Sequence, residues 1–192
     1  MFSAPKRILD PFLADTESTT GAAIVEFAVA LPLLIVLVVG IFDFGGAFNI
    51  KQELGNAMRE AARFGAAQPT NDLRNGGTPP SVDAIRKLVD SYLLAARIND
   101  CGLGGVAVPG AGPPWVYTAA GNGCAGTLSL TINRGVVLSE TVGGTTINLL
   151  ATQVGISYPY QWRFNNALHL ISPGSTFALA NIPADATAVN QD

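Results

Sequence analysis

The sequence predicts an α+β fold in which a long N-terminal helix packs on a second helix and on a C-terminal antiparallel sheet. Two observations predict it. In the first half of the chain apolar residues recur at intervals of three and four, and beyond residue 100 they alternate with polar residues. The first spacing is typical of one helix face and the second of a half-buried strand. Because helical segments come first and strands follow, the two should form separate layers.

The composition limits the classes of function. The chain has 192 residues, of which 48% are apolar and 13% are charged, about half the charged share of roughly 25% in ordinary soluble proteins. This length has room for one membrane-spanning helix and one modest domain. A net charge of −3 and a pI near 5.0 offer no basic surface for nucleic acid, so a nucleic-acid partner is not expected.

Residues 22–42 form an apolar run that is long enough to cross a membrane. Glu26 is the only ionisable side chain in these 21 residues. A helix of this length spans roughly 30 Å, the thickness of a bilayer core. A polar leader, residues 1–20, precedes the run, whereas a secretory signal peptide begins with basic residues and ends at a small-residue cleavage site. The run therefore predicts a membrane helix that is retained.

The residues beyond Asp43 continue this helix with an apolar stripe. Polar and charged side chains occupy the other positions, which is the pattern of an amphipathic helix that buries one face. Gly65 offers a C-terminal stop, and Pro69 lies just beyond it. We expect one helix over about 22–64. Its stripe consists of Ala47, Ile50, Leu54, Ala57, Ala61 and Phe64.

Several stretches resemble the TadE-like family of minor pilins, or pseudopilins, of the tight-adherence (Tad/Flp) type IV pilus. They are GAAIVEFAVALP (21–32), GIFDFG (40–45), NAMREAARFGA (56–66) and VGISYPYQW (154–162). The resemblance implies a pilin-like fold and cleavage after Gly21 by a prepilin peptidase. Ala22 would then be the new N-terminus and Glu26 the fifth residue of the mature chain. Phe27 stands where the major pilins have tyrosine.

A carboxylate in hydrocarbon costs at least a few kcal/mol and usually marks function. The resemblance suggests that Glu26 pairs with the α-amino group of Ala22, on its own chain or on a neighbour's. Such a pair would set the axial register, because a slipped register leaves both charges unpaired. The alternative is that Glu26 lies among the lipid headgroups as a simple anchor. Pro32 removes one backbone donor, and an ordinary bend and a role in assembly both remain open for it.

The resemblance also implies an organisation and a set of partners. It divides the chain into a leader (1–21), a transmembrane half-helix (22–43), an amphipathic half-helix (44–67) and an exported α+β domain (68–192). The expected partners are other pilins and minor pilins of the same fibre, the prepilin peptidase and the inner-membrane assembly platform. The expected location is the bacterial inner membrane, with a cytoplasmic N-terminus and a periplasmic C-terminal domain, and then the extracellular pilus. The role would be in pilus initiation, assembly or tip formation for adhesion.

A second function remains open at this point. An uncleaved, single-pass envelope protein whose periplasmic domain binds a partner or ligand would show the same membrane helix.

The exported part is expected to begin with a helix and continue with strands. A helix follows the loop at 68–80, with Ser81 or Thr78 as its cap and an apolar face. Alternation predicts strands over 127–133 and 145–158, with a bulge or break near 150–153, where the alternation changes parity. Weaker strand patterns occupy 176–180 and 186–189, on either side of Pro183. The helix face consists of Val82, Ile85, Leu88, Val89, Tyr92 and Ala96.

Cys101 and Cys124 are the only cysteines, and in an exported domain such a pair is most simply a disulfide that restrains the loop between them. Together with His169, the only histidine, they supply too few ligands for a metal site, so neither a metal nor a cofactor is expected. The chain has no P-loop, HExxH or GxSxG motif, and a non-catalytic protein is expected. Five aromatic residues belong either to the core, which we favour, or to a contact surface. They are Trp115, Tyr117, Tyr158, Tyr160 and Trp162.

Overall fold

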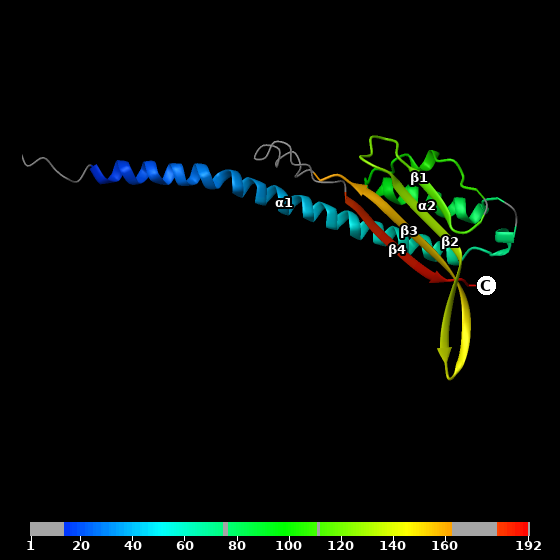
Figure 1. Ribbon diagram of the computed structural model, residues 1–192. Coiled ribbons are helices and arrows are strands. Elements are labelled where there is room, and N and C mark those ends of the chain that lie inside the picture. Colours follow the sequence, from blue (N-terminus) through cyan, green and yellow to red (C-terminus); the bar gives the residue numbers. More distant parts are fainter. Residues whose placement is uncertain (1–13, 75–76, 111, 163–179, 192) are drawn as a thin grey trace, which may run out of the picture. The chain divides into compact units, whose positions relative to one another are not determined.

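Figure 1 shows a computed structural model of the protein, which describes residues 14–74, 77–110, 112–162 and 180–191. Two α-helices, α1 (Ala14–Ala66) and α2 (Pro80–Ala95), are followed by four strands. The strands are β1 (Trp115–Ala119), β2 (Leu128–Val142), β3 (Thr145–Tyr160) and β4 (Ala180–Val189), and short 3-10 helices span Asn71–Arg74 and Leu103–Gly105. The predicted α+β fold, with a long N-terminal helix, a second helix and an antiparallel sheet, is confirmed.

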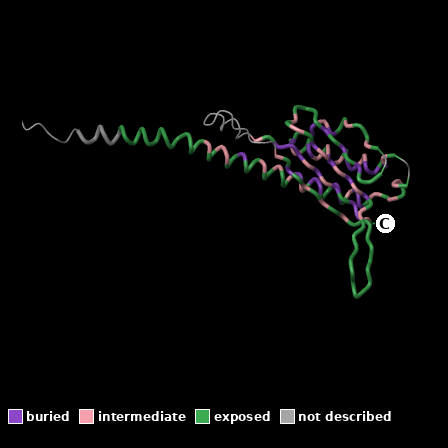
Figure 2. The backbone as a smooth tube through the Cα atoms, in the orientation of Figure 1, coloured by how far each residue is buried: buried purple, intermediate pink, exposed green. Residues whose placement is uncertain are grey.

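The chain divides into two compact units. The first contains α1 up to Phe42, and the second contains Asp43–Trp162 and the C-terminal strand β4. Within the first unit almost every residue from Gly21 to Phe42 is exposed, as the green tube in Figure 2 shows. This segment is apolar and long enough to cross a membrane, which suggests a membrane anchor or a signal. The helix is continuous through Pro32.

The second half of α1 buries the predicted stripe. Leu54, Ala57 and Ala61 are fully or almost fully buried, and Met58 and Ala62 widen the buried face. The helix ends at Ala66, close to the expected residue 64, but Gly65 does not act as the terminator that the sequence suggested. Its φ is not positive, so it forms no left-handed cap.

Gly65 is required instead by the packing of α1. A β-carbon at this position would lie 2.8 Å from Ile85 Cδ1 of α2 and 2.8 Å from Thr152 Cγ2 of β3. Both distances are shorter than carbon atoms tolerate, because van der Waals contact lies at about 3.5–4.0 Å. The glycine therefore lets α1 approach α2 and the sheet closely at one point.

The sheet has the order β1-β2-β3-β4, and all neighbouring strands are antiparallel. Alternate side chains on one face form the core. Leu130 of β2 pairs with Tyr117 of β1 on one side and with Ile156 of β3 on the other, and all three side chains are buried. The opposite face carries the exposed or half-buried side chains of Val116, Thr118, Ser129 and Gln153. The helices therefore cover one side of a half-buried sheet, as alternation predicts.

Two strands differ from the sequence prediction. The segment 115–119 forms the edge strand β1. The sequence does not predict this strand, because it has only five residues and lies between glycine- and proline-rich stretches. In place of two strands around Pro183, residues 180–189 form the single strand β4. A proline is compatible with a strand at the edge of a sheet, where its missing N–H is not needed. The expected strand at 176–180 lies outside the described residues except for Ala180.

The predicted irregularity opposite 150–153 is present, but the extra residue lies on β2. Asn133 pairs with Gln153 and Val136 pairs with Ala151, so Arg134 and Gly135 together face Thr152. Beyond this bulge, β2 continues to Val142, well past the expected end at residue 133. β2 and β3 then form a two-stranded hairpin that projects from the sheet (Figure 1). We call residues 136–150 the hairpin arm.

Candidate functional site

Glu26 lies on a helix face that it shares with the predicted cleavage site. A shallow groove runs along this face, and three of its seven lining residues are glycine or alanine. Small side chains let another helix backbone approach closely in a membrane. The carboxylate forms no ion pair with any residue that the structure describes. The groove is lined by Gly21, Ala22, Val25, Glu26, Val29, Ala30 and Leu33.

The arrangement brings Glu26 and Ala22 together, one helical turn apart on the same face. The peptide bond between Gly21 and Ala22 lies inside α1, which begins at Ala14. Phe27 is 64% exposed and is not among the residues that line the groove. Pro32 is likewise not among them. Of the three residues predicted to act in assembly, only Glu26 therefore lines this groove.

A second cluster, which we call the junction clasp, lies where the globular unit begins. Tyr160, the last residue of β3, donates a hydrogen bond of 2.6 Å from its hydroxyl to Asp43 Oδ1 and contacts the Asp43 carbonyl oxygen at 3.2 Å. Both residues are buried. The Phe44 and Trp162 rings lie 5.0 Å apart, and Trp162 meets the Tyr160 ring edge-on at 5.1 Å, a favourable aromatic geometry. The clasp fixes α1 to the end of β3.

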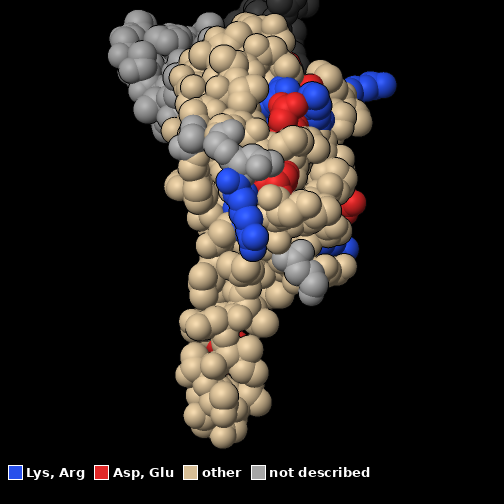
Figure 3. Space-filling model, turned by 90° about the vertical axis from the view of Figure 1, so that its right-hand side faces the viewer, with Lys and Arg blue, Asp and Glu red and all other residues tan. Residues whose placement is uncertain are grey.

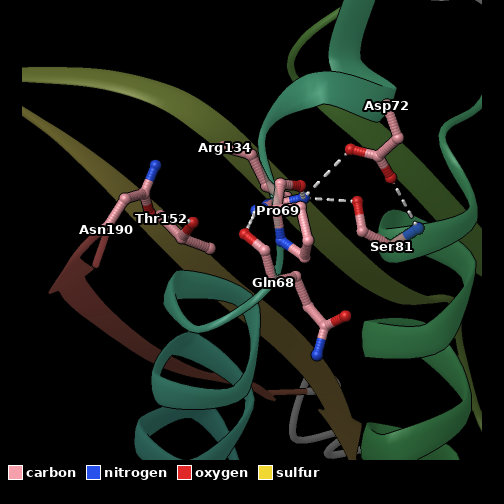
Figure 4. A network of polar contacts seen from close by, with 7 residues as sticks. All are labelled: Gln68, Pro69, Asp72, Ser81, Arg134, Thr152 and Asn190. Atoms are coloured by element: carbon pink, nitrogen blue, oxygen red, sulfur yellow. Dashed lines mark hydrogen bonds and ion pairs between the residues drawn. The ribbon is translucent and has the colours of Figure 1, made fainter. Parts of the chain in front are cut away.

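Arg134 is the centre of a third polar cluster, shown in Figure 4. Its side chain is fully buried. Its Nη2 donates to the Gln68 carbonyl oxygen at 2.6 Å, and its Nη1 donates to the Pro69 carbonyl oxygen at 3.2 Å and to Ser81 Oγ. Asp72 Oδ1 lies 3.4 Å from the same nitrogen. The charged bulge residue thus joins the C-terminal end of α1, the following loop and the start of α2.

Asp72 also serves as the cap of α2. The helix begins after Pro79 without a side-chain cap of its own, and the backbone N–H of Ser81 donates to Asp72 Oδ2 at 3.0 Å. A carboxylate at a helix N-terminus satisfies a free donor and is favoured by the helix dipole. The expectation that Ser81 or Thr78 caps this helix is therefore wrong. Thr78 donates instead to the carbonyl oxygen of Pro109.

Cys101 and Cys124 form the expected disulfide, with their α-carbons 5.4 Å apart. Hydrogen bonds tie the two ends of the bridged loop together as well. Asn99 Nδ2 donates to the Asn122 carbonyl oxygen at 2.7 Å, and Gly121 N donates to the Cys101 carbonyl oxygen at 2.7 Å. The bridge thus closes a loop whose base is already ordered.

Two carboxyl groups near this loop, Asp90 and Asp100, have pKa values that are shifted in opposite directions. Burial and the negative charge of Asp100 raise the pKa of Asp90 above its usual range. Burial acts in the same direction on Asp100, but hydrogen bonds from Asn122 and from the Gly102 backbone outweigh it and hold the pKa of Asp100 below its usual range. As the pH falls, Asp90 therefore takes up a proton before Asp100 does. Among the described residues no group of three or more histidine, cysteine or carboxylate side chains is placed to hold a metal.

Four of the five aromatic residues belong to the core. Trp115, Tyr117, Tyr158 and Tyr160 are each at most 8% exposed, which confirms the favoured interpretation, and Trp162 packs against the same core in a partly buried position. Burial raises the pKa of the Tyr117 and Tyr158 hydroxyls. His169 lies outside the described residues.

Asp43 and Arg134 were not singled out by the sequence. Asp43 belongs to the GIFDFG stretch, but the sequence predicts no role for its side chain, and Arg134 belongs to no motif. Their partners lie 117 residues away for Asp43 and up to 66 for Arg134, so no local spacing could reveal them. The one available signal was a charged residue that interrupts the alternation of a strand.

Comparison with known proteins finds a family match for the N-terminal part of the chain. Residues 21–63 match the family model described as TadE-like protein. This range contains the predicted cleavage site, the apolar run and most of the amphipathic half of α1, and it ends before α2 and the sheet. A search of curated proteins found no match, and neither did a search of solved structures.

Proposed function

We propose that this chain, a member of the TadE-like family through residues 21–63, is a minor pilin or pseudopilin of a Tad-type pilus. In this role it is cleaved after Gly21 by a prepilin peptidase and takes part in pilus initiation, assembly or tip formation for adhesion. It acts without catalysis and without a cofactor. Its partners are other pilins of the fibre, the peptidase and the inner-membrane assembly platform.

The observation that carries the proposal is the exposed apolar helix face around Glu26. A helix with an apolar surface all round needs lipid or other helices around it. Glu26 lies one turn from Ala22 on the groove-bearing face, so after cleavage its carboxylate is within reach of an α-amino group. In a medium of low dielectric constant that pairing is favourable only in one register, since a slipped register leaves two bare charges.

The proposal implies a topology. The N-terminus starts in the cytoplasm, α1 crosses the inner membrane, and the unit that begins at Asp43 folds in the periplasm before it enters an extracellular fibre. The disulfide between Cys101 and Cys124 supports this side of the membrane, because disulfides persist in oxidising compartments and are rare in the cytosol.

Mass spectrometry of the protein from its native membrane tests cleavage. The proposal expects a chain that begins at Ala22, whereas a chain that retains residues 1–21 would support the uncleaved envelope protein instead. Glu26→Gln and Glu26→Leu should both be cleaved but should reduce incorporation into sheared fibres at least tenfold. Glu60→Gln, on the exposed side of the amphipathic half, is the matched control. Normal incorporation of Glu26→Leu would refute the pairing.

A further inference from the structure

The hairpin arm is a surface that neither the core nor the membrane helix uses. It contains six complete cross-strand pairs, from Val137 and Leu150 to Val142 and Thr145, closed by Gly143 and Gly144. Both glycines have positive φ values, as a tight hairpin turn requires. At about 3.3 Å per residue the arm reaches roughly 20 Å beyond the bulge. Residues 137–150 are all exposed, as the green hairpin in Figure 2 shows.

The two faces of the arm differ in chemistry. Toward the tip, one face pairs Ser139 with Asn148 and Thr141 with Thr146, and both pairs are joined by their side chains at 2.8 Å and 3.4 Å. At the base of the arm the same face carries the exposed pair Val137 and Leu150. The other face is apolar, with one acid, Glu140, opposite Ile147. This apolar face consists of Leu138, Glu140, Val142, Ile147 and Leu149, whose four apolar side chains are 39–60% exposed.

Such an arm is expected to be covered by another molecule. An isolated two-stranded hairpin is marginally stable in water, and contiguous exposed apolar side chains usually mark a surface that another molecule covers. In Figure 3 the projection at the bottom of the molecule is almost free of charged atoms. Glu140 is its single charged residue. The expected partner surface is therefore apolar and carries positive charge.

This chain itself has a surface of that kind. A groove of about 640 Å³ lies between α1 and the edge strand β4, and we call it the α1–β4 groove. That volume suits several side chains and is too small for a folded domain. Lys51 and Arg59 line its helix side together with Phe48, which is 62% exposed. Asp185 lies on the strand side, so the lining has a net charge of +1.

Neither cation of the groove has an acidic partner in the described chain. Lys51 forms no ion pair there, and Arg59 is hydrogen-bonded only to the neutral side chain of Asn56. Pro183 removes a backbone donor from β4 at the groove. That gap disfavours the addition of another strand to this edge and favours an insertion through side chains.

We propose that the hairpin arm of one copy of this chain docks in the α1–β4 groove of a second copy. Glu140 then lies against Lys51 and Arg59, while Val142 and Ile147 cover Phe48. This contact goes beyond the proposed function, because it requires neither cleavage after Gly21 nor the membrane helix.

The arm does not reach its own groove. Gly155 of β3 pairs with Asp185 in the groove wall, and ten residues of β3 separate Gly155 from Thr145 at the arm tip, about 33 Å of strand. The arm and the groove therefore lie toward opposite ends of β3. A contact between two different surfaces repeats from copy to copy and forms an open chain unless its rotation closes a ring.

Thiol cross-linking of the full chain in detergent micelles tests the contact. Cys101 and Cys124 are joined to each other, so a bismaleimide reacts only with introduced cysteines. Val142→Cys on one epitope-tagged chain is mixed with Gln52→Cys on a chain that carries a different tag. The proposal expects a cross-linked dimer that carries both tags, and no dimer from either variant alone. Leu94→Cys, on the exposed side of α2, replaces Val142→Cys in the matched control and should give at least tenfold less product.

Charge reversal provides the second readout. Glu140→Lys on the arm should lower the cross-linked yield by roughly fivefold, the effect of losing one good ion pair, and Lys51→Glu with Arg59→Glu on the groove should lower it similarly. Combining the reversed arm with the reversed groove should restore the yield. Failure of that rescue would overturn the proposal, and so would a cross-link only between two Val142→Cys chains.

Discussion

The hydroxyl of Tyr160 donates a 2.6 Å hydrogen bond to Asp43 Oδ1 across 117 residues of chain. Both partners are buried, and a buried hydrogen bond to a carboxyl group is worth more than an exposed one because neither partner has water as a substitute. The junction clasp thereby fixes where the globular unit begins on the long helix.

Tyr160→Phe should destabilise the globular unit by about 1–3 kcal/mol, because it removes the donor and leaves a buried carboxyl oxygen without this partner. Urea unfolding of the full chain in detergent, followed by circular dichroism, measures the loss. Tyr92→Phe is the matched control, since Tyr92 is half-buried and its hydroxyl makes no hydrogen bond within the described residues. Equal stability of the two variants would contradict the importance of the clasp.

Gly65→Ala should cost about 1–3 kcal/mol through overpacking, although alanine is the better helix former. The added methyl group would lie 2.8 Å from both Ile85 Cδ1 and Thr152 Cγ2. Gly55→Ala is the control on the same helix, because its nearest neighbour would be Arg59 Nη1 at 3.9 Å, and it should stabilise by up to about 1 kcal/mol. Adding Ile85→Val to Gly65→Ala should recover part of the loss in thermal unfolding.

Arg134→Met should be the most damaging of these substitutions, at about 3 kcal/mol or more, because it strips a donor from several buried acceptors and a cation from Asp72. The Gln68 and Pro69 carbonyl oxygens lose their Arg134 donors. Hydrogen exchange should increase at the start of α2, where Asp72 acts as the cap. Arg97→Met, at an exposed position, should change stability by less than about 0.5 kcal/mol.

Asp90→Asn should stabilise the protein at pH 7 and have little effect near pH 3. The raised pKa of Asp90 means that the folded state binds its proton more tightly than the unfolded state. This group's contribution is therefore lost as the pH rises from about 4, the unfolded value, through the raised pKa. The asparagine avoids that loss. The gain should be below about 1 kcal/mol because the carboxyl is partly solvated.

Asp83→Asn should show the opposite dependence on pH. Hydrogen bonds from Lys87 and Arg86 outweigh burial and lower the pKa of Asp83, so its stabilising contribution is present above about pH 4 and disappears as the pH falls through the lowered value. The variant should be less stable than the wild type at pH 7 and equal to it at low pH. Thermal unfolding from pH 3 to pH 7 measures both variants, and parallel curves would refute both assignments.

Local periodicity predicted what depends on local spacing. The stripe from Leu54 to Ala61 repeats often enough to identify both the helix and its buried face, and the alternation around Leu130 did the same for the sheet. The strand β1 was not predicted, because five residues are too few to show a clear alternation of apolar and polar side chains. The sequence predicted two strands in place of β4 because proline usually interrupts a strand. Pro183 is compatible with a single strand only because β4 lies at the edge of the sheet, and local sequence does not reveal that position.

The candidate sites divide in the same way. Glu26 is conspicuous because a single acid interrupts an apolar run, so sequence alone identified it. Asp43 and Arg134 owe their roles to partners that only the folded chain brings near. The apolar side of the hairpin arm was hidden because the bulge at Arg134 and Gly135 interrupts the alternation that would have extended the strand.

The bulge at Arg134 and Gly135 also determines which face of the hairpin arm carries the exposed apolar side chains. With one additional residue on β2, the odd-numbered side chains beyond it take over the side of the sheet that faces the helices, and Leu138 and Val142 turn outward. If β2 paired without the bulge, with Gly135 opposite Ala151, Leu138 and Val142 would lie on the side that faces the helices while Ile147 and Leu149 of β3 kept their orientation. The apolar side chains would then be divided between the two faces of the arm. The one extra residue on β2 therefore gathers Leu138, Val142, Ile147 and Leu149 on one face of the arm.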